Sequence, residues 1–307
     1  MMALVGLALA GCTLPGRPLP DPDAPSDAPR PEERIPERSE ASLELSRYYA
    51  RVQRDLLSQG LLRGDGGGPD TPFDERVLAE NFIQIALFDE YVSTSGRLVA
   101  RPTPSTLRRW SGPISLSVEF GQTVDLEQRR NDLRNIDRFA GRLARLTGVP
   151  IRIGARGANF HVLVLNEDER LDYGPRLREL VPGISDPTVN AIVNMPRSTF
   201  CLVFAFAGAD RRGGYTDAIV VIRGEHPDLL RQSCIHEELA QAMGLANDSP
   251  TARPTIFNDD EEFGLLTTHD EFLLQMLYDP RLTIGMNAEE AGPIVRQIAA
   301  ELLSPDS

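Results

Sequence analysis

The segment 234–248 carries the residues whose types and spacing could do chemistry, and it reads CIHEELAQAMGLAND. Glu237 and Gln241 lie four positions apart, so in a helix they share one face and are separated by one turn. Glu238 places a second carboxyl group beside them, and Gly244 permits a tight turn after the helix. Because carboxylates can hold a cation or activate a water molecule, this segment is the first candidate for a functional site.

The spacing resembles the active-site helix of the metzincin zinc proteases, whose pattern is H-E-x-x-H-x-x-G-x-x-H. In that family three His residues bind zinc and the Glu polarises the attacking water. When Gly244 is aligned with the family's Gly, Glu237, Gln241 and Asn247 stand at the three His positions. Glu238 then stands at the catalytic Glu. The resemblance implies a zincin-like fold that keeps the general base and has replaced all three imidazoles.

The replaced ligands predict that no zinc binds. Zinc prefers nitrogen and sulfur ligands, whereas these positions offer one carboxylate and two neutral amide oxygens. Calcium and magnesium accept oxygen ligands, but they require more carboxylates or waters. We therefore expect no metal and no other cofactor, and a Glu238 that has no metal-bound water to activate. The alternative is a peptidase that uses an unusual metal, or Glu238 together with His236.

Later segments extend the resemblance. Residues 255–258 lie where a metzincin has its Met-turn, with Phe257 in the place of the methionine, and residues 267–278 resemble the closing helix. The chain also resembles, over about residues 72–285, an uncharacterised family of bacterial lipoproteins known as domain of unknown function 2927. The segments that carry this resemblance are 85–91, 107–110, 237–248 and 257–259. It implies family membership but no established activity.

The N-terminus predicts export and lipidation. Residues 1–11 are uncharged and lead into Cys12, and the sequence LAGC at positions 9–12 matches a bacterial lipobox. The run is too short to span a bilayer of about 30 Å, so we expect residues 1–11 to be a cleaved lipoprotein signal peptide. Cys12 would then anchor the protein to a membrane, facing the periplasm. Thr13 in place of Asp favours the outer over the inner membrane.

Export to an oxidising compartment favours disulfide formation. With Cys12 lipidated, Cys201 and Cys234 remain, and we expect a disulfide that pins the candidate helix to the sheet. The alternative is two buried, reduced cysteines that act as small hydrophobic side chains.

The formal net charge of −13 and the isoelectric point near 4.9 argue against nucleic acid as a partner, because phosphates would be repelled by such a surface. Contact with a membrane is expected only through the lipid anchor.

The rest of the chain predicts three parts. Residues 12–40 are rich in Pro and charged residues and should form a disordered tether, 41–63 an N-terminal helix, and 72–302 the metzincin-like domain. Within that domain, helices are expected over 74–80, 126–147, 173–180, 226–245 and 268–277, and strands over 81–91, 114–120, 151–153, 160–165, 200–206 and 218–222. This order indicates an α+β fold with a mixed sheet backed by two long helices.

Three functions follow from these observations. The first is an envelope lipoprotein whose non-catalytic, metzincin-like domain binds an extended peptide at the sheet edge or an envelope protein. The second is an active peptidase, and the third is a purely structural envelope lipoprotein. Zinc or manganese bound in stoichiometric amount would favour the second.

Overall fold

The computed structural model describes residues 35–94, 97–154, 157–208, 214–258 and 260–304. The predicted lipobox and most of the predicted tether lie outside the described residues. Among the helices that are described, none is both long and apolar enough to cross a membrane.

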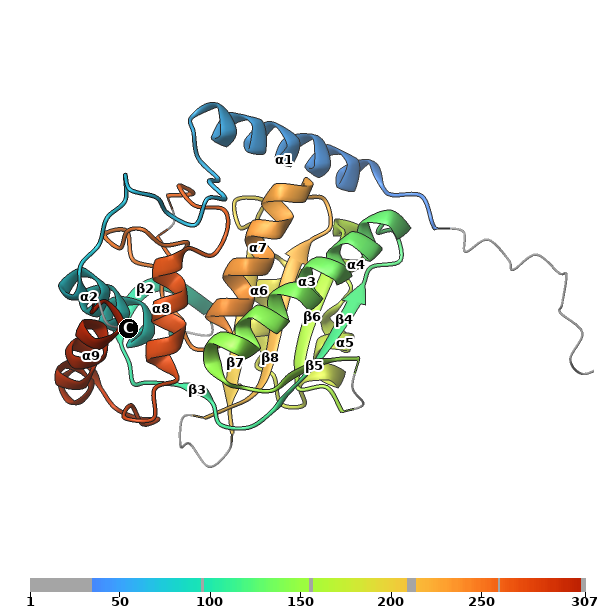
Figure 1. Ribbon diagram of the computed structural model, residues 1–307. Helices are drawn as coiled ribbons and strands as arrows, with labels where there is room; N and C mark the ends of the chain where they lie inside the picture. The colour runs from blue at the N-terminus through green and yellow to red at the C-terminus, as the bar shows by residue number, and fades with distance from the viewer. Residues whose placement is uncertain (1–34, 95–96, 155–156, 209–213, 259, 305–307) are drawn as a thin grey trace, which may run out of the picture. The chain divides into compact units, whose positions relative to one another are not determined.

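The described part of the domain is built on a six-stranded mixed sheet (Figure 1). Its strands are β3 (Arg109–Trp110), β4 (Ile114–Phe120), β5 (Ile151–Ile153), β6 (Phe160–Leu165), β7 (Cys201–Ala207) and β8 (Gly214–Arg223). The strand order is β3-β8-β6-β4-β5 with parallel pairing throughout. β7 pairs antiparallel with β8, and Cys201 lies opposite Ile222. Within the described residues β8 is the sole strand partner of β7, so β7 is an edge strand.

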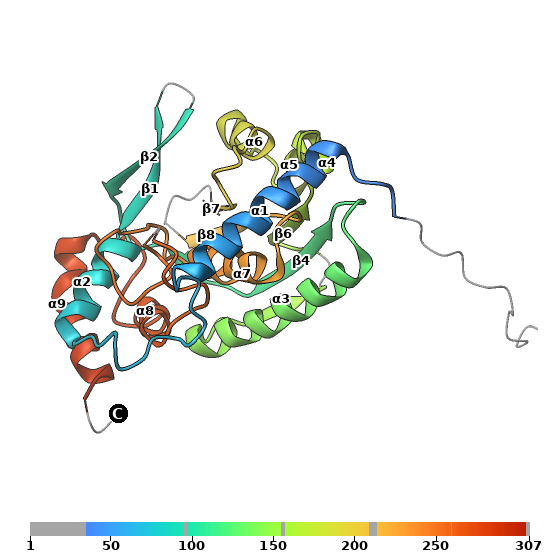
Figure 2. The same ribbon diagram turned by 90° about the horizontal axis from the view of Figure 1, so that it is seen from above.

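Alternating side chains of the central strands face two layers of helices. On β8, Val220 and Ile222 belong to the cluster that contains α3 (Leu126–Thr147) and α7 (Asp228–Gln241). The intervening side chains of β8, Ile219 and Val221, pack with α5 (Gly174–Leu180) and α6 (Asp186–Val193). Figure 2 shows the sheet between these two layers. Continuous apolar runs in β6 and β8 are thus explained by burial on both faces.

The remaining elements complete the described part of the domain. They are α1 (Glu40–Ser58), α2 (Glu75–Ala86), the hairpin β1 (Phe88–Thr94) and β2 (Arg97–Pro104), α4 (Glu167–Arg170), α8 (Thr268–Leu277) and α9 (Ala288–Leu302). Tyr49 on α1 is fully buried and its ring lies edge-on to that of His226, with 4.4 Å between centroids. Helices α2 and α9 pack against each other although they come from opposite ends of the domain (Figure 1).

The predicted α+β class is confirmed, and the strand predicted over 81–91 is wrong in its first half. Residues 81–86 belong to α2, and β1 begins only at Phe88. Short apolar runs fit a strand or a buried helix equally well. The helix forms because Leu78, Phe82 and Ile85 then lie on one face that is buried in the core. Helices α6 and α9 were not predicted.

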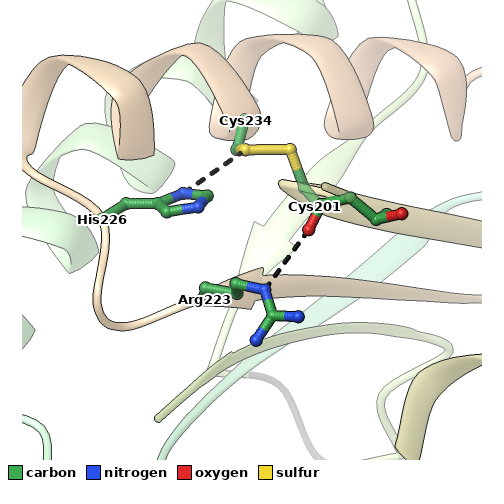
Figure 3. The surroundings of a disulfide bond; sticks show 5 residues. Cys201, Arg223, His226 and Cys234 are labelled. Atoms are coloured by element: carbon green, nitrogen blue, oxygen red, sulfur yellow. Dashed lines mark hydrogen bonds between the residues drawn. A yellow bond between two sulfur atoms is a disulfide. The ribbon is translucent and has the colours of Figure 1, made fainter. Parts of the chain in front are cut away.

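The predicted disulfide between Cys201 and Cys234 is confirmed (Figure 3). It joins the first residue of β7 to the middle of α7, with 5.9 Å between the two Cα atoms. His226 approaches the bond, and its Nδ1 atom lies 3.8 Å from the Sγ atom of Cys234. Both side chains are buried, so the covalent bond holds the edge strand against the helix.

Reduction of this disulfide should destabilise the protein. The bond closes a loop with a sequence separation of 33 residues, which in the chain-entropy description corresponds to about 3–4 kcal/mol. We expect the double variant Cys201→Ser/Cys234→Ser to lose this amount in urea unfolding and to become insensitive to reductant. Wild-type protein that melts at the same temperature with and without reductant would contradict the expectation.

Candidate functional site

The candidate helix α7 ends just before a turn at Gly244. Its last residue is Gln241, and Gly244 follows with φ of +124°, a conformation that side chains strongly disfavour. Carbonyl groups at this helix end are satisfied from elsewhere in the chain. The indole Nε1 of Trp110 donates to the Ala242 carbonyl at 2.9 Å, and the Tyr278 hydroxyl donates to the Met243 carbonyl at 2.9 Å. The turn therefore has a fixed position against β3 and α8.

A pocket of about 300 Å³ opens beside α7. Its walls come from β1, from β7 and the segment that leads into it, from α7 and from two later loops. The lining residues are Glu90, Tyr91, 198–203, Glu237, Glu238, Gln241, Asp248 and Glu261. Five of these side chains are carboxylic acids, and Lys, Arg and His are absent from the described residues that line the pocket. The site is therefore strongly acidic.

The structure brings three of the four predicted site residues into this pocket. Glu237, Glu238 and Gln241 line it, whereas Asn247 does not. The Nδ2 atom of Asn247 donates to the carbonyl of Gln84 at 2.8 Å, and its backbone N–H donates to that of Ile85 at 3.1 Å. Asn247 thus ties the loop after Gly244 to the end of α2.

Asp248 lines the pocket in the place expected for Asn247. Its Oδ1 atom accepts a hydrogen bond from Nε2 of Gln241 at 3.0 Å. Sequence reasoning missed Asp248, Glu90 and Glu261 as members of the site. The signal that could have found the first two is their place in the segments 237–248 and 85–91, which carry the family resemblance.

Glu238 is the most deeply buried acid of the pocket, with 5 % of its surface exposed. Its Oε2 atom is buried and has no hydrogen-bond partner within the described chain. Burial raises the pKa of Glu238 well above its ordinary value, and the nearby carboxyl groups of Glu90 and Asp248 raise it further. These effects favour the protonated form of the side chain while the pocket holds no cation.

His236 lies outside the acidic pocket, on the side of α7 that faces α3. Its ring stacks on that of Phe139 on α3, with 4.0 Å between centroids, and its Nδ1 atom accepts from the backbone N–H of Leu266 at 3.1 Å. Burial, with a smaller effect of Arg142, lowers the pKa of His236 to about 3. The imidazole is therefore neutral and committed to the core, and it does not line the pocket with Glu238.

The pocket residues do not fit the zinc ion that the metzincin resemblance would imply. Among the described residues, the group of potential ligand atoms that comes together consists of Cys201 Sγ and carboxylate oxygens of Glu237 and Glu238, all within 4.8 Å of one another. The sulfur is bonded to Cys234 and cannot act as a thiolate. Two carboxylates remain, without the nitrogen or sulfur donors that zinc prefers.

A second cavity of about 300 Å³ continues the pocket along β7. The two share Glu90, Tyr91, Val203 and Gln241 as lining residues, and the second is also lined by residues 204–206 of β7. Because β7 is an edge strand, the combined groove follows a line of strand backbone.

Replacing Glu238 with Gln should stabilise the protein in a pH-dependent way. A raised folded-state pKa means that the stability of the wild type is greatest below the unfolded-state value of about 4.3 and falls as the pH rises towards the folded-state pKa. A neutral amide avoids that loss, so the advantage of the variant should grow with pH by up to about 1.4 kcal/mol per unit. Urea unfolding between pH 4 and 8 measures it. Glu237→Gln removes a half-exposed carboxyl group and is the matched control; equal pH profiles for the two variants would contradict the assignment.

Comparison with known proteins gives one match. Neither the curated proteins nor the solved structures contain a match to the chain. The sequence profile of one protein family matches residues 75–297, which run from the first residue of α2 into α9 and include every residue of the acidic pocket. The chain therefore belongs to the family described as "Protein of unknown function (DUF2927)".

Proposed function

We propose that the chain is a lipid-anchored envelope protein whose metzincin-like domain binds an extended peptide along β7 without cleaving it. The observation that carries the proposal is the groove beside this edge strand, which ends in the acidic pocket. An exposed strand edge offers backbone N–H and C=O groups to a further strand, and side-chain pockets beside it supply selectivity.

The order of elements supports the metzincin-like part of the proposal. A strand (β4), a long helix (α3), further strands and then α7 with its glycine turn follow one another as the resemblance implies. The absence of hydrolysis is proposed from ligand chemistry, because the pocket offers oxygen atoms where zinc would need nitrogen or sulfur. Peptide binding then remains as a function that the groove can serve.

Peptide binding can be tested with a library of unmodified and backbone N-methylated peptides of identical side chains. Strand addition requires the peptide N–H groups, so N-methylation should abolish binding measured by fluorescence anisotropy. Equal binding of both series would exclude pairing with β7. Cleavage of any library peptide, or stoichiometric zinc or manganese in the purified protein together with cleavage, would favour the peptidase instead.

The proposed lipid anchor predicts a separate result. Protein made in its native host should begin at Cys12 and carry acyl chains, and Cys12→Ser should move it from the membrane to the soluble fraction. Anchoring by acyl chains depends on the CH₂ groups that they bury in the bilayer, so loss of the whole lipid group should release the protein. Mass spectrometry that finds an intact, unlipidated N-terminus would contradict the anchor.

A further inference from the structure

We infer that the acidic pocket selects an arginine side chain of the bound peptide. The inference rests on the proposed function, because it assigns one residue of the peptide that would lie along β7. It names the chemistry that the groove recognises, namely a guanidinium group held by the carboxyl groups of the pocket.

The charge of the pocket is complementary to a cation. Its five acids come from separate parts of the chain: Glu90 from β1, Glu237 and Glu238 from α7, and Asp248 and Glu261 from two loops. Their convergence on one cavity is a product of the fold and not of one acidic stretch. No Lys, Arg or His side chain is among the described residues that line it.

Glu238 provides an independent indication that the pocket is built for a ligand. Its Oε2 atom has no hydrogen-bond partner within the described chain, although only 5 % of the residue's surface is exposed. A buried oxygen without a donor has lost its hydrogen bonds to water and gained none in return. A guanidinium that enters the pocket would bring N–H donors to the carboxyl group of Glu238, which lines it.

The spread of the acids favours an extended cation over a metal ion. A calcium ion needs six to eight oxygens at about 2.3–2.6 Å from one point. Among the described residues, one group of three potential ligand atoms comes together, all within 4.8 Å of one another. Its members are one carboxylate oxygen each from Glu237 and Glu238 and the Sγ atom of Cys201, which belongs to the disulfide. Glu90, Asp248 and Glu261 line the same pocket without joining that group. A guanidinium carries five N–H donors over a planar fork and can reach acids that are spread apart.

Arginine fits this pocket better than lysine. The pocket is lined by the aromatic residues Tyr91 and Phe200, and a guanidinium stacks on aromatic faces and is less strongly hydrated than an ammonium group. The volume of about 300 Å³ lies at the lower end of the range for ligand pockets, which suits one side chain. Because alternate side chains of a strand point to the same side, one residue of a peptide along β7 would enter the pocket next to Cys201.

The test uses the full-length protein and peptides that differ at one central position, which holds Arg, Lys, Gln or citrulline. Citrulline keeps the shape of arginine but has no charge. Hydrogen bonds to a charged group are stronger than those to a neutral one. We therefore expect the Arg peptide to bind at least about ten-fold more tightly than the citrulline peptide, and the Lys peptide to have an intermediate affinity. Glu237→Gln and Asp248→Asn should remove most of that preference, measured as the ratio of the Arg-peptide to citrulline-peptide affinities of each variant. Glu127→Gln, on the exposed surface of α3, changes the net charge equally and should leave the preference intact.

The outcomes separate the inference from the proposed function. Equal binding of the Arg and citrulline peptides would overturn the inference and leave peptide binding standing. If no peptide binds but free agmatine does, and Glu237→Gln abolishes it, the guanidinium pocket is supported and the peptide groove is not. Tight binding of calcium chloride alone that Glu237→Gln removes would overturn the inference in favour of a metal site. Thermal unfolding of each variant checks that it is folded.

Discussion

Replacing Gly244 with alanine should destabilise the domain by about 3–5 kcal/mol, through backbone strain and a steric clash together. With φ at +124°, this residue has a conformation that costs any L side chain energy. A Cβ atom there would also collide with the backbone carbonyl oxygen of Arg108 and lie 3.1 Å from Cδ2 of Leu277. A backbone carbonyl cannot rotate away as a side chain can, so the loop would have to shift. Urea unfolding of the variant measures the loss.

Gly285 provides the matched control. It also has a positive φ, +94°, but a Cβ atom placed on it would meet nothing within 4 Å. Gly285→Ala should therefore cost only the conformational part, about 1–2 kcal/mol. If both variants lost the same stability, the close approach of Gly244 to Arg108 would have no energetic importance, and the position of the turn would have to be explained in another way.

Replacing Arg231 with Met should cost a similar amount, about 3–5 kcal/mol at neutral pH. The Nε atom of this buried Arg donates to both carboxylate oxygens of Asp132 at 2.7 and 2.8 Å, which links α7 to α3. Without the cation, a carboxylate remains buried with no compensating charge. Burial raises the pKa of Asp132 and Arg231 opposes that effect, so the variant should raise it further.

The sign of the pH effect distinguishes this cause from lost packing. The destabilisation should be full at neutral pH and should shrink as the pH falls and Asp132 becomes protonated. The double variant Arg231→Met/Asp132→Asn should recover part of the loss at neutral pH, because no buried charge remains. Arg76→Met, which breaks an exposed ion pair with Glu80, should change stability by less than about 1 kcal/mol. A loss in Arg231→Met that is independent of pH would point to packing alone.

Much of the sheet layer could be predicted because its signals are local. Helix α3 is bounded by Asp125, whose side chain accepts from the first backbone N–H groups, and by Gly148 in the left-handed conformation. Both residue types are common helix boundaries, and the predicted range 126–147 is confirmed. The strands β6 and β8 likewise follow from apolar runs. The strand predicted over 81–91 is wrong at 81–86 because the burial of that run depends on distant helices.

The candidate site was less predictable because its members come together through long-range contacts. The spacing of Glu237, Glu238 and Gln241 is set by one helix, so they could be found together. Past Gly244 the direction of the chain depends on hydrogen bonds from Asn247 to α2, some 160 positions earlier. These bonds hold Asn247 buried against α2, while Asp248 lines the pocket. Glu90 lies on β1 of the hairpin, and the sequence pattern around residue 240 contains no information on which distant segment packs beside α7.

The pairing of α2 with α9 has a consequence for the order in which the domain can form. Leu78, Phe82 and Ile85 are buried in the same cluster as Val295 and Ile298, at the other end of the matched region. Because the ribosome makes α2 more than 200 positions before α9 is complete, the part of α2 that packs on α9 has no lasting partner while the intervening chain is synthesised. A chain that stops before residue 288 would contain every residue of the acidic pocket and still leave exposed the part of α2 that α9 covers. Burial of this part of α2 therefore occurs only after α9 has been synthesised.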